Sequence, residues 1–340
     1  MYNTVGRGMP EATPDKRVLV YERMDPTDQS LEWLVQRGIQ VTRGRPMWQQ
    51  PYARYADAEI IGAAAGYPAV MGASGVQFTA DVIEALPELR FISKFGVGVD
   101  NINLEAAARR GILIANTPED SEVVDVAEHT LGMILTLRKK LLQWTPKYMQ
   151  QGGWRPGIFA ETVAGSTVGL IGLGHVGRAV VERLKGWGVK IQAHDPNCAP
   201  APAEVQLTDL HTLLKTSDII SLHATPSAEN RHMIDEAAFD LMKPTAILIN
   251  TARASLVDTS ALIKALKSKK IAGAAVDVYD QEPPEAASKL FRQENLVVTP
   301  HTAAWTSKGV QNIAWHAARN LAAMMLGDGR ADLVNLKAPS

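Results

Sequence analysis

Arg253, Glu282 and His301 each stand a few residues beyond the end of a short apolar segment in the second half of this chain. Histidine has an unperturbed pKa of about 6.5, so His301 suits general acid–base work at a hydroxyl or carbonyl group. A neighbouring carboxylate, Glu282, would orient the imidazole and favour its protonated form. The planar guanidinium of Arg253 suits a bidentate contact with a carboxylate. Together these residues predict a 2-keto or 2-hydroxy acid as substrate.

A glycine motif, G-x-G-x-x-G, lies between a buried apolar segment and an amphipathic one, at Gly172, Gly174 and Gly177. In this context the first glycine permits a tight turn, the second lets the backbone approach a pyrophosphate, and the third lets strand and helix pack closely. Amide groups at the helix start then meet the phosphates. The motif predicts a dinucleotide site, and the alternative is a tight turn without a ligand.

Asp195 lies 18 residues beyond Gly177, at the end of the next apolar segment. A carboxylate at this position accepts hydrogen bonds from the adenosine ribose and repels a 2′-phosphate. It therefore predicts NAD(H) as cofactor, with NADP disfavoured. The alternative is a surface turn residue before Pro196.

Short β-branched segments alternate with helix-period segments from Arg17 onward, which is typical of parallel sheets with crossover helices. We expect four strands in the first half, at Val18–Glu22, Ala69–Gly72, Arg90–Phe95 and Ile112–Asn116. Helices are expected between them at Asp28–Arg37, Thr79–Leu86 and Leu104–Arg110. This half predicts a small α/β substrate domain of flavodoxin-like type.

The second half predicts a doubly wound, parallel-sheet Rossmann domain. Its six expected strands are Val168–Ile171, Val189–Ala193, Ile219–Ala224, Ala246–Asn250, Gly273–Val278 and Leu296–Thr299, with a less regular gap before the last. A final helix, Ser307–Leu326, is expected to pack back on the first domain. The Rossmann domain, residues 119–302, would thus be inserted into a discontinuous substrate domain of residues 1–118 and 303–340.

A long helical pattern at Ser121–Leu142 is followed by Gln143–Gly165, which carries Gly, Pro and Trp without clear periodicity. A simple connection is rarely this long. We expect the helix and this arm, about residues 121–165, to reach over a partner subunit.

Composition excludes several function classes. The chain has 340 residues, with 35 basic and 36 acidic side chains, so no strong field of one sign favours nucleic acid or a membrane surface. Cys198 is the only cysteine, which excludes an intramolecular disulfide and a cysteine-based metal cluster. The polar lead-in Met1–Lys16 lacks the apolar core of a signal peptide, and no apolar run is long enough to span a bilayer. We expect a cytoplasmic protein of two domains without a metal.

The pattern from Gly172 to His301 resembles the D-isomer-specific 2-hydroxyacid dehydrogenase family, which includes phosphoglycerate, D-lactate and glyoxylate/hydroxypyruvate enzymes. The resemblance extends from about Arg17 to the end of the chain. It implies an oxidoreductase that moves a hydride between NAD(H) and C2 of a small D-2-hydroxy or 2-keto acid. His301 would be the general acid/base, Glu282 its partner, and Arg253 would bind the substrate carboxylate or carbonyl.

The resemblance also implies binding residues beyond the catalytic three. Backbone amides of Val97 and Gly98 would bind the acid, and Lys94, Arg253 and Trp305 would contribute to the substrate pocket. Residues implied at the cofactor are Gly172, Gly174, His175, Val176, Gly177, Asp195, Thr225, Pro226, Asn230, Thr251, Ala252, Arg253, Asp277, His301, Ala303 and Ala304. Two assignments stay open. Asp277 binds the nicotinamide amide or caps its strand, and Trp305 walls the pocket or belongs to the core or an interface.

Three further points follow from the resemblance. Members of the family usually dimerise through the long helix and arm, so a homodimer is expected. Ala254 stands where the family usually has glycine, a substitution that costs about 1 kcal/mol if the position needs a positive φ. The alternative function is a non-enzymatic NAD(H)-sensing binding protein of the corepressor type. The substituent on C2 of the acid is not specified by these residues.

Overall fold

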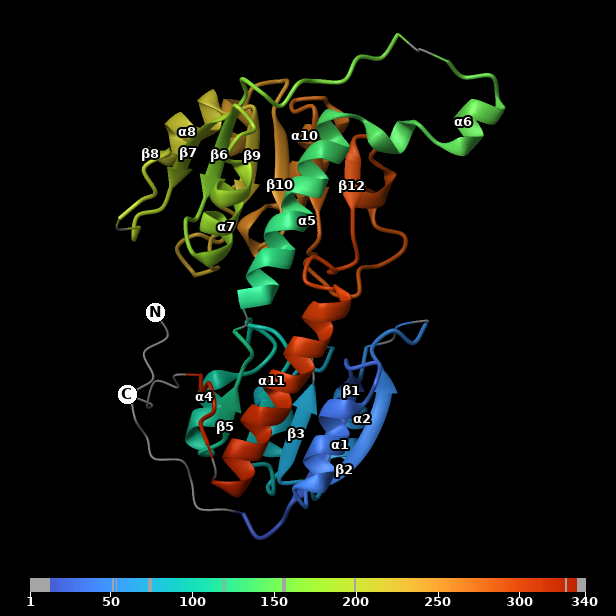
Figure 1. Cartoon of the computed structure of the whole chain (residues 1–340), viewed down its shortest axis with the longest axis vertical. Helices are drawn as coiled ribbons and strands as arrows, with labels where there is room; N and C mark the ends of the chain where they lie inside the picture. The colour runs from blue at the N-terminus through green and yellow to red at the C-terminus, as the bar shows by residue number, and fades with distance from the viewer. Residues whose placement is uncertain are drawn as a thin grey trace. The chain divides into compact units, whose positions relative to one another are not determined.

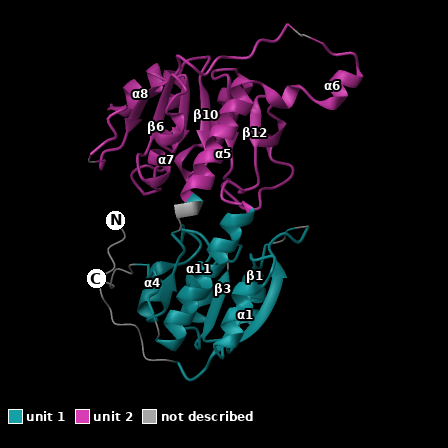
Figure 2. Ribbon diagram, in the orientation of Figure 1, with its two compact units in different colours: residues 1–122, 307–340 teal, residues 123–306 magenta. Residues whose placement is uncertain are grey.

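The computed structural model divides into two compact units, shown in Figures 1 and 2. The structure describes residues 13–334 apart from 51, 53, 73–74, 119, 155–156, 199 and 328, so most of the expected lead-in lies outside the described residues. Unit 1 comprises residues 1–122 and 307–340, and unit 2 comprises residues 123–306. Unit 2 is therefore inserted into unit 1, as expected if the last helix packs back on the first domain.

Unit 1 contains a parallel five-stranded sheet in the order β2-β1-β3-β4-β5, which is the flavodoxin-like order. The strands are β1 Arg17–Arg23, β2 Gln40–Pro46, β3 Ala69–Gly72, β4 Phe91–Lys94 and β5 Leu113–Ala115. The four expected strands are confirmed, and β2 was missed. This edge strand has the sequence QVTRGRP and no fully buried residue, so it carries no apolar pattern to recognise.

Alternating residues of β1 supply the two cores of unit 1. Val18 and Val20 face α1 and α11, whereas Leu19 and Tyr21 face the opposite layer. This is the period of two that a strand imposes when both of its faces are covered. The helices of this unit are α1 Gln29–Gln36, α2 Asp57–Ala64, α3 Ala80–Glu84, α4 Leu104–Arg109 and α11 Ser307–Leu326, of which α2 was not predicted.

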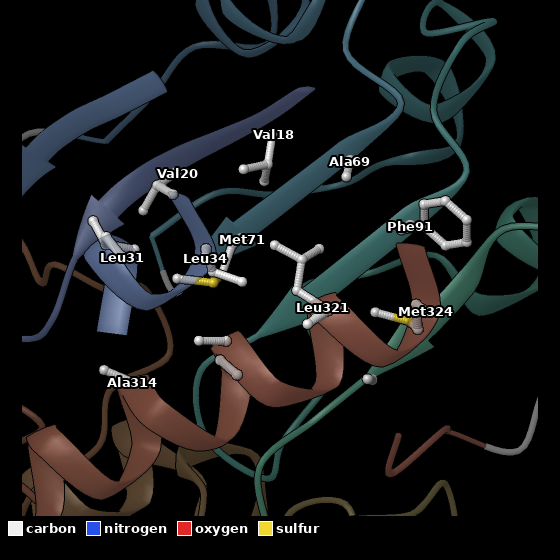
Figure 3. Close-up of a cluster of buried hydrophobic side chains, with 14 of the residues drawn as sticks. Val18, Val20, Leu31, Leu34, Ala69, Met71, Phe91, Ala314, Leu321 and Met324 are labelled. Carbon is white, nitrogen blue, oxygen red and sulfur yellow. The ribbon is translucent and has the colours of Figure 1, made fainter. Parts of the chain in front are cut away.

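Helix α11 is the last helix of the chain and packs against β3, β4 and β5 of unit 1. Figure 3 shows Ala314, Leu321 and Met324 directed from α11 toward the strand side chains. Ser93 Oγ in β4 also donates a hydrogen bond to the carbonyl oxygen of Ala317 at 2.8 Å. The final helix therefore completes the core of the domain that begins the chain.

Unit 2 contains a parallel seven-stranded sheet in the order β12-β11-β10-β9-β6-β7-β8. The strands are β6 Thr167–Ile171, β7 Lys190–His194, β8 Val205–Leu207, β9 Ile219–Leu222, β10 Ile247–Asn250, β11 Gly273–Val276 and β12 Leu296–Val298. All six expected strands are present. The seventh, β8, has three residues of which two are exposed, too short to give a pattern. Strand order reverses between β6 and β9, which is where open α/β sheets bind ligands.

Three helices of unit 2 begin at a capping aspartate. Asp209, Asp235 and Asp258 each accept a hydrogen bond from the amide three residues further on, which starts α8, α9 and α10. The helix bounds are α7 His175–Leu184, α8 Leu210–Thr216, α9 Glu236–Leu241 and α10 Thr259–Lys267. The irregular last gap contains only the 3₁₀ helix η3, Lys289–Arg292.

The long helix is shorter than expected. Helix α5 spans Asp120–Arg138, and a short 3₁₀ helix η1, Leu141–Gln143, follows it. The break falls at Lys140, whose positive φ of 54° is incompatible with a continuing helix. Beyond it, the arm contains α6, Pro146–Gln150, which extends away from the sheet of unit 2 (Figure 1).

Replacing Leu321 by alanine tests the role of α11. The side chain is fully buried, so Leu321→Ala should lower the free energy of unfolding of unit 1 by about 2–5 kcal/mol. Urea denaturation followed by circular dichroism measures this. Val35→Ala, on the exposed side of α1, is the control and should change stability by less than about 0.5 kcal/mol. Equal losses for both variants would contradict the packing described.

Candidate active site

The glycine loop joins β6 to α7. Of its three motif glycines, only the central one, Gly174, has room for a Cβ atom. A Cβ atom on Gly172 would lie 2.5 Å from the amide nitrogen of Ala224, and one on Gly177 would lie 2.4 Å from the carbonyl oxygen of Gly172. A Cβ on Gly174 would meet no atom within 4 Å. Gly172 also has a positive φ of 95°. The outer glycines thus permit close backbone packing, and the central one leaves room for a phosphate.

Helix α7 begins at His175, and Gly174 caps it without a side-chain hydrogen bond. Its first amides are therefore not satisfied by a capping side chain and suit an anion. His175 is exposed and Val176 is half-buried at this helix start. These residues fit the pyrophosphate of a dinucleotide.

Asp195 follows β7 and is bound to the glycine loop. Its Oδ2 accepts a hydrogen bond from the amide of Leu173 at 2.8 Å, and its Oδ1 accepts one from the amide of Asn197 at 2.9 Å. Each carboxylate oxygen can accept a second hydrogen bond. The half-exposed carboxylate is therefore held beside the loop with capacity for sugar hydroxyls.

The loop after β9 contains Thr225, Pro226 and Asn230. Asn230 Nδ2 donates to the carbonyl oxygen of Thr225 at 2.8 Å, and its Oδ1 accepts from the amide of Ser227 at 2.7 Å. Asn230 therefore shapes this loop. Just before it, burial lowers the pKa of His223 to about 4, so this histidine is neutral near pH 7, consistent with a structural role.

Arg253 lies in the turn between β10 and the 3₁₀ helix η2, Ala254–Leu256. Its Nη1 donates a hydrogen bond to the carbonyl oxygen of Ala252 at 2.8 Å. Thr251 is buried, and its hydroxyl lies 3.0 Å from the hydroxyl of Thr130 in α5. Ala254 does not have a positive φ, so alanine in place of glycine carries little backbone cost here.

His301 and Glu282 form a direct pair. His301 Nδ1 lies 2.6 Å from Glu282 Oε2, and Glu282 Oε1 accepts a hydrogen bond from the amide of Tyr279 at 3.0 Å. The histidine side chain is 50% exposed and the glutamate side chain 38%. Since Nδ1 is bound to the carboxylate, Nε2 is the ring nitrogen available to exchange a proton with a ligand.

The pKa of Glu282 is lowered on balance. Burial raises it, but the hydrogen bond and charge of His301, the Tyr279 amide and the charge of Arg253 together outweigh burial. The carboxylate therefore stays ionised. The two predicted catalytic residues beyond the ends of β11 and β12 thus meet, and Arg253 lies within their electrostatic reach.

Asp277, almost fully buried, holds the turn that carries His301. Its Oδ1 accepts hydrogen bonds from Thr299 Oγ1 at 2.6 Å and the amide of Thr302 at 2.8 Å, and its Oδ2 accepts one from the amide of Ala303 at 2.9 Å. This geometry agrees with a strand-end cap, the second of its two interpretations.

Other contacts in this region were not anticipated from the sequence. His129 Nε2 in α5 lies 3.0 Å from Thr299 Oγ1. Asn250 binds both sides of the Arg253 turn. Ala303 is buried and Ala304 half-buried, while Trp305 is 38% exposed, so it is not a core residue of unit 2. No sequence motif marks the contact of His129, because it joins a helix to the segment after β12.

The predicted substrate loop lies in unit 1, after β4. Gly96 N donates to Thr117 Oγ1 at 2.8 Å, and the Asn116 side chain donates to the carbonyl oxygen of Val97 at 2.7 Å. Lys94 is buried, and its Nζ donates to the carbonyl oxygen of Phe95 at 2.9 Å. Val97 and Gly98 are half-buried, so their backbone remains partly accessible.

Within the described ranges, no group of three or more His, Cys, Asp or Glu side chains is arranged to hold a metal ion. None of the described helices combines the length and apolar character that crossing a membrane requires.

Comparison with known proteins identifies relatives of the whole arrangement. Residues 131–303 match the family model described as D-isomer specific 2-hydroxyacid dehydrogenase, NAD binding domain. The chain is 40% identical to a glyoxylate reductase from Thermofilum pendens over 266 residues, which cover 75% of this chain and 78% of that protein. It is 34% identical to a D-3-phosphoglycerate dehydrogenase from Archaeoglobus fulgidus over 324 residues. That match covers 94% of this chain but 59% of the relative.

Solved structures show the same architecture. The TT0316 protein from Thermus thermophilus aligns with a TM-score of 0.83 and 30% identity, covering 94% of this chain and all of that one. The apo-structure of D-lactate dehydrogenase from Escherichia coli aligns with a TM-score of 0.76 and 29% identity, again over 94% of this chain and all of the other.

Glu282→Gln tests the charge of the pair through the pH dependence of stability. Because folding lowers the pKa of Glu282, its ionised form stabilises the protein above the usual glutamate pKa of about 4.3. The wild type should therefore exceed the variant in free energy of unfolding near pH 7. The difference should shrink as pH falls through the lowered pKa. Urea titrations at several pH values measure it. Glu285→Gln, which replaces an exposed carboxylate nearby, is the control. A Glu282→Gln variant with the same free energy of unfolding as the wild type at every pH would contradict the pairing.

Proposed function

The chain belongs to the D-isomer-specific 2-hydroxyacid dehydrogenase family, and from this premise we propose that His301, Glu282 and Arg253 are its catalytic residues. The proposed reaction interconverts a small 2-keto acid and the D-2-hydroxy acid at C2. The observation that carries the proposal is the 2.6 Å contact between His301 Nδ1 and Glu282 Oε2. It leaves Nε2 as the proton donor or acceptor.

The roles of the three residues follow from their chemistry. NAD(H), when bound, supplies or accepts the hydride at C2. His301 Nε2 donates a proton to the carbonyl oxygen in reduction and takes the hydroxyl proton in oxidation. The ionised Glu282 orients the imidazole and stabilises its charge. Arg253 binds the substrate carboxylate or carbonyl through its planar fork.

For unit 1, we propose that the loop after β4 binds a carboxylate through the backbone amides of Val97 and Gly98. Both residues are half-buried, in a loop held by Asn116 and Thr117. Lys94 contributes to this loop. Trp305, which is partly exposed, borders the group attached to C2.

NAD(H) is the proposed cofactor in preference to NADP(H). Asp195 supports this choice because its carboxylate is fixed beside the glycine loop by the amide of Leu173. A 2′-phosphate brought close to this charge would be repelled, whereas a 2′-hydroxyl would donate a hydrogen bond to it. The glycine loop, the Thr225–Asn230 loop and residues 251–253 complete the proposed cofactor site.

A panel of small 2-keto acids with NADH and with NADPH tests this function. We expect oxidation of NADH by at least one acid such as glyoxylate, hydroxypyruvate or pyruvate, and a lower kcat/KM with NADPH. His301→Ala should reduce kcat by more than about 100-fold, since general acid catalysis contributes roughly 10²–10⁴. The fall in absorbance of the reduced cofactor gives the rates.

Two results would argue against the proposal. Full activity of His301→Ala would exclude the proposed acid. Tight NADH binding without turnover of any acid would instead favour the NAD(H)-sensing function. His211→Ala is the matched control, because His211 lies at the start of α8, on a different element from the proposed site, and should keep the wild-type rate.

We propose that the arm after α5 joins two copies of this chain. Large apolar side chains of the arm are exposed, with Trp154 at 70% and Phe159 at 80%. Leu142, Met149 and Ile158 are exposed as well. A cluster of this kind on a solvent-exposed surface is typical of an interface. The arm extends beyond the sheet of unit 2 (Figure 1), so its apolar side chains are available to contact another chain. We propose that this chain is a second copy of the same protein.

Phe159→Asp tests the homodimer. The charge should prevent burial of the arm, so light scattering should find a dimer for the wild type and monomers for the variant at low micromolar concentration. Trp48→Asp, an exposed tryptophan in unit 1, should stay dimeric. A monomeric wild type at all concentrations would refute the proposed assembly.

A further inference from the structure

The side chain of Asn250 closes the turn that carries Arg253. Its Oδ1 accepts a hydrogen bond from the amide of Ala252 at 3.1 Å, and its Nδ2 donates one to the carbonyl oxygen of Arg253 at 2.9 Å. One carboxamide thus binds both sides of the turn between β10 and η2.

Asn250 is itself held firmly. It is the last residue of β10, lies opposite Leu222 and Val276 in the sheet, and is 2% exposed. Its carbonyl oxygen accepts the amide of Asp277 at 3.0 Å. The side chain therefore extends from a rigid strand end, and the turn is built on that frame.

The Ala252 peptide connects this carboxamide to the guanidinium. Asn250 Oδ1 binds the amide of Ala252, and Arg253 Nη1 binds the carbonyl oxygen of the same residue. The orientation of the Ala252 peptide therefore fixes the position of the Arg253 backbone. It also fixes the direction of the hydrogen bond that holds the guanidinium. A change at Asn250 would alter both.

Only a carboxamide of this length can make both contacts. An aspartate in its place accepts but cannot donate when ionised, and leucine does neither. The carbonyl oxygen of Arg253 also accepts a hydrogen bond from the amide of Leu256 at 3.3 Å, so it would keep one donor. An ionised aspartate, however, would place a second acceptor beside this carbonyl oxygen where Nδ2 now donates, and the turn would rearrange to separate them. The guanidinium would move with it.

We propose that Asn250 is the positioning residue for Arg253 in the reaction. It does not touch the substrate, and it acts by fixing the turn from which the guanidinium reaches the acid. This inference rests on the proposed role of Arg253.

The test is a double-mutant cycle of Asn250→Asp and Arg253→Leu, with kcat/KM for the 2-keto acid found active and the Kd for NADH as readouts. Asn250→Asp alone should lower kcat/KM by about 10- to 100-fold, the size expected when a buried polar contact is lost. The Kd for NADH should change by less than about threefold. In the Arg253→Leu background, Asn250→Asp should change kcat/KM by less than about twofold, because a residue that acts through another has no effect without it.

The outcomes separate this inference from the proposed function. If Asn250→Asp lowers kcat/KM by the same factor in the wild-type and Arg253→Leu backgrounds, Asn250 has a general structural role and the inference is overturned. It is also overturned if Asn250→Asp keeps the wild-type kcat/KM while Arg253→Leu is inactive. Full activity of Arg253→Leu would overturn the proposed role of Arg253 and the inference together. If Asn250→Asp does not fold, Asn250→Ser enters the same cycle, because its shorter hydroxyl cannot bridge both sides of the turn.

Asn295 provides a control in the same unit. It lies before β12, at the amino ends of the strands, and its Nδ2 donates to the carbonyl oxygens of Leu266 and Ala272 at 3.3 Å each. Asn295→Asp removes the same kind of donor and should lower the thermal midpoint while leaving kcat/KM per folded molecule unchanged. A drop in kcat/KM as large as that of Asn250→Asp would overturn the inference.

Discussion

The buried carboxylate of Asp277 determines the geometry of the proposed catalytic end of unit 2. Three donors from the segment after β12 converge on it, on both sides of His301. His301 itself adopts a positive φ of 54°, a conformation that a non-glycine residue keeps only when its surroundings impose it. The imidazole therefore reaches Glu282 because the hydrogen bonds to Asp277 hold the backbone of this turn. Asp277 directly follows the strand that precedes Glu282, so one segment supplies both the support and the partner.

Much of the fold follows from hydrophobic periodicity, and its failures have a common physical cause. Strands with both faces covered, such as β6 and β10, are continuous apolar runs and were predicted. The edge strands β2 and β8 were missed because a strand with one neighbour and exposed side chains needs no apolar residues. The end of α5 was misplaced for a different reason. Lys140 stops the helix through its backbone conformation, which side-chain patterning does not encode.

The residues of the proposed site also fall into those that the sequence predicts and those that it does not. His301, Glu282 and Arg253 stand out in the sequence because their chemistry is distinctive and each follows a strand. Asn250 and Thr299 do not stand out. Thr299 binds Asp277, which lies far from it in the sequence, and Asn250 binds a turn just beyond its own strand, a contact that depends on the backbone conformation of that turn. Asp277 was identified, and its three donors support one of its two interpretations, the strand-end cap. Residue type predicts which groups react, whereas the tertiary structure is required to show which groups hold them.

The position of α11 affects the order in which a new chain can fold. Unit 1 lacks a layer of its core until residues 307–326 are made, while its five strands are complete by residue 115. Unit 2, from residue 123 to 306, is synthesised in between. At about 5–20 residues per second this takes about 10 to 40 s. During that interval the faces of β3 and β4 that α11 later covers are apolar surface on a nascent chain.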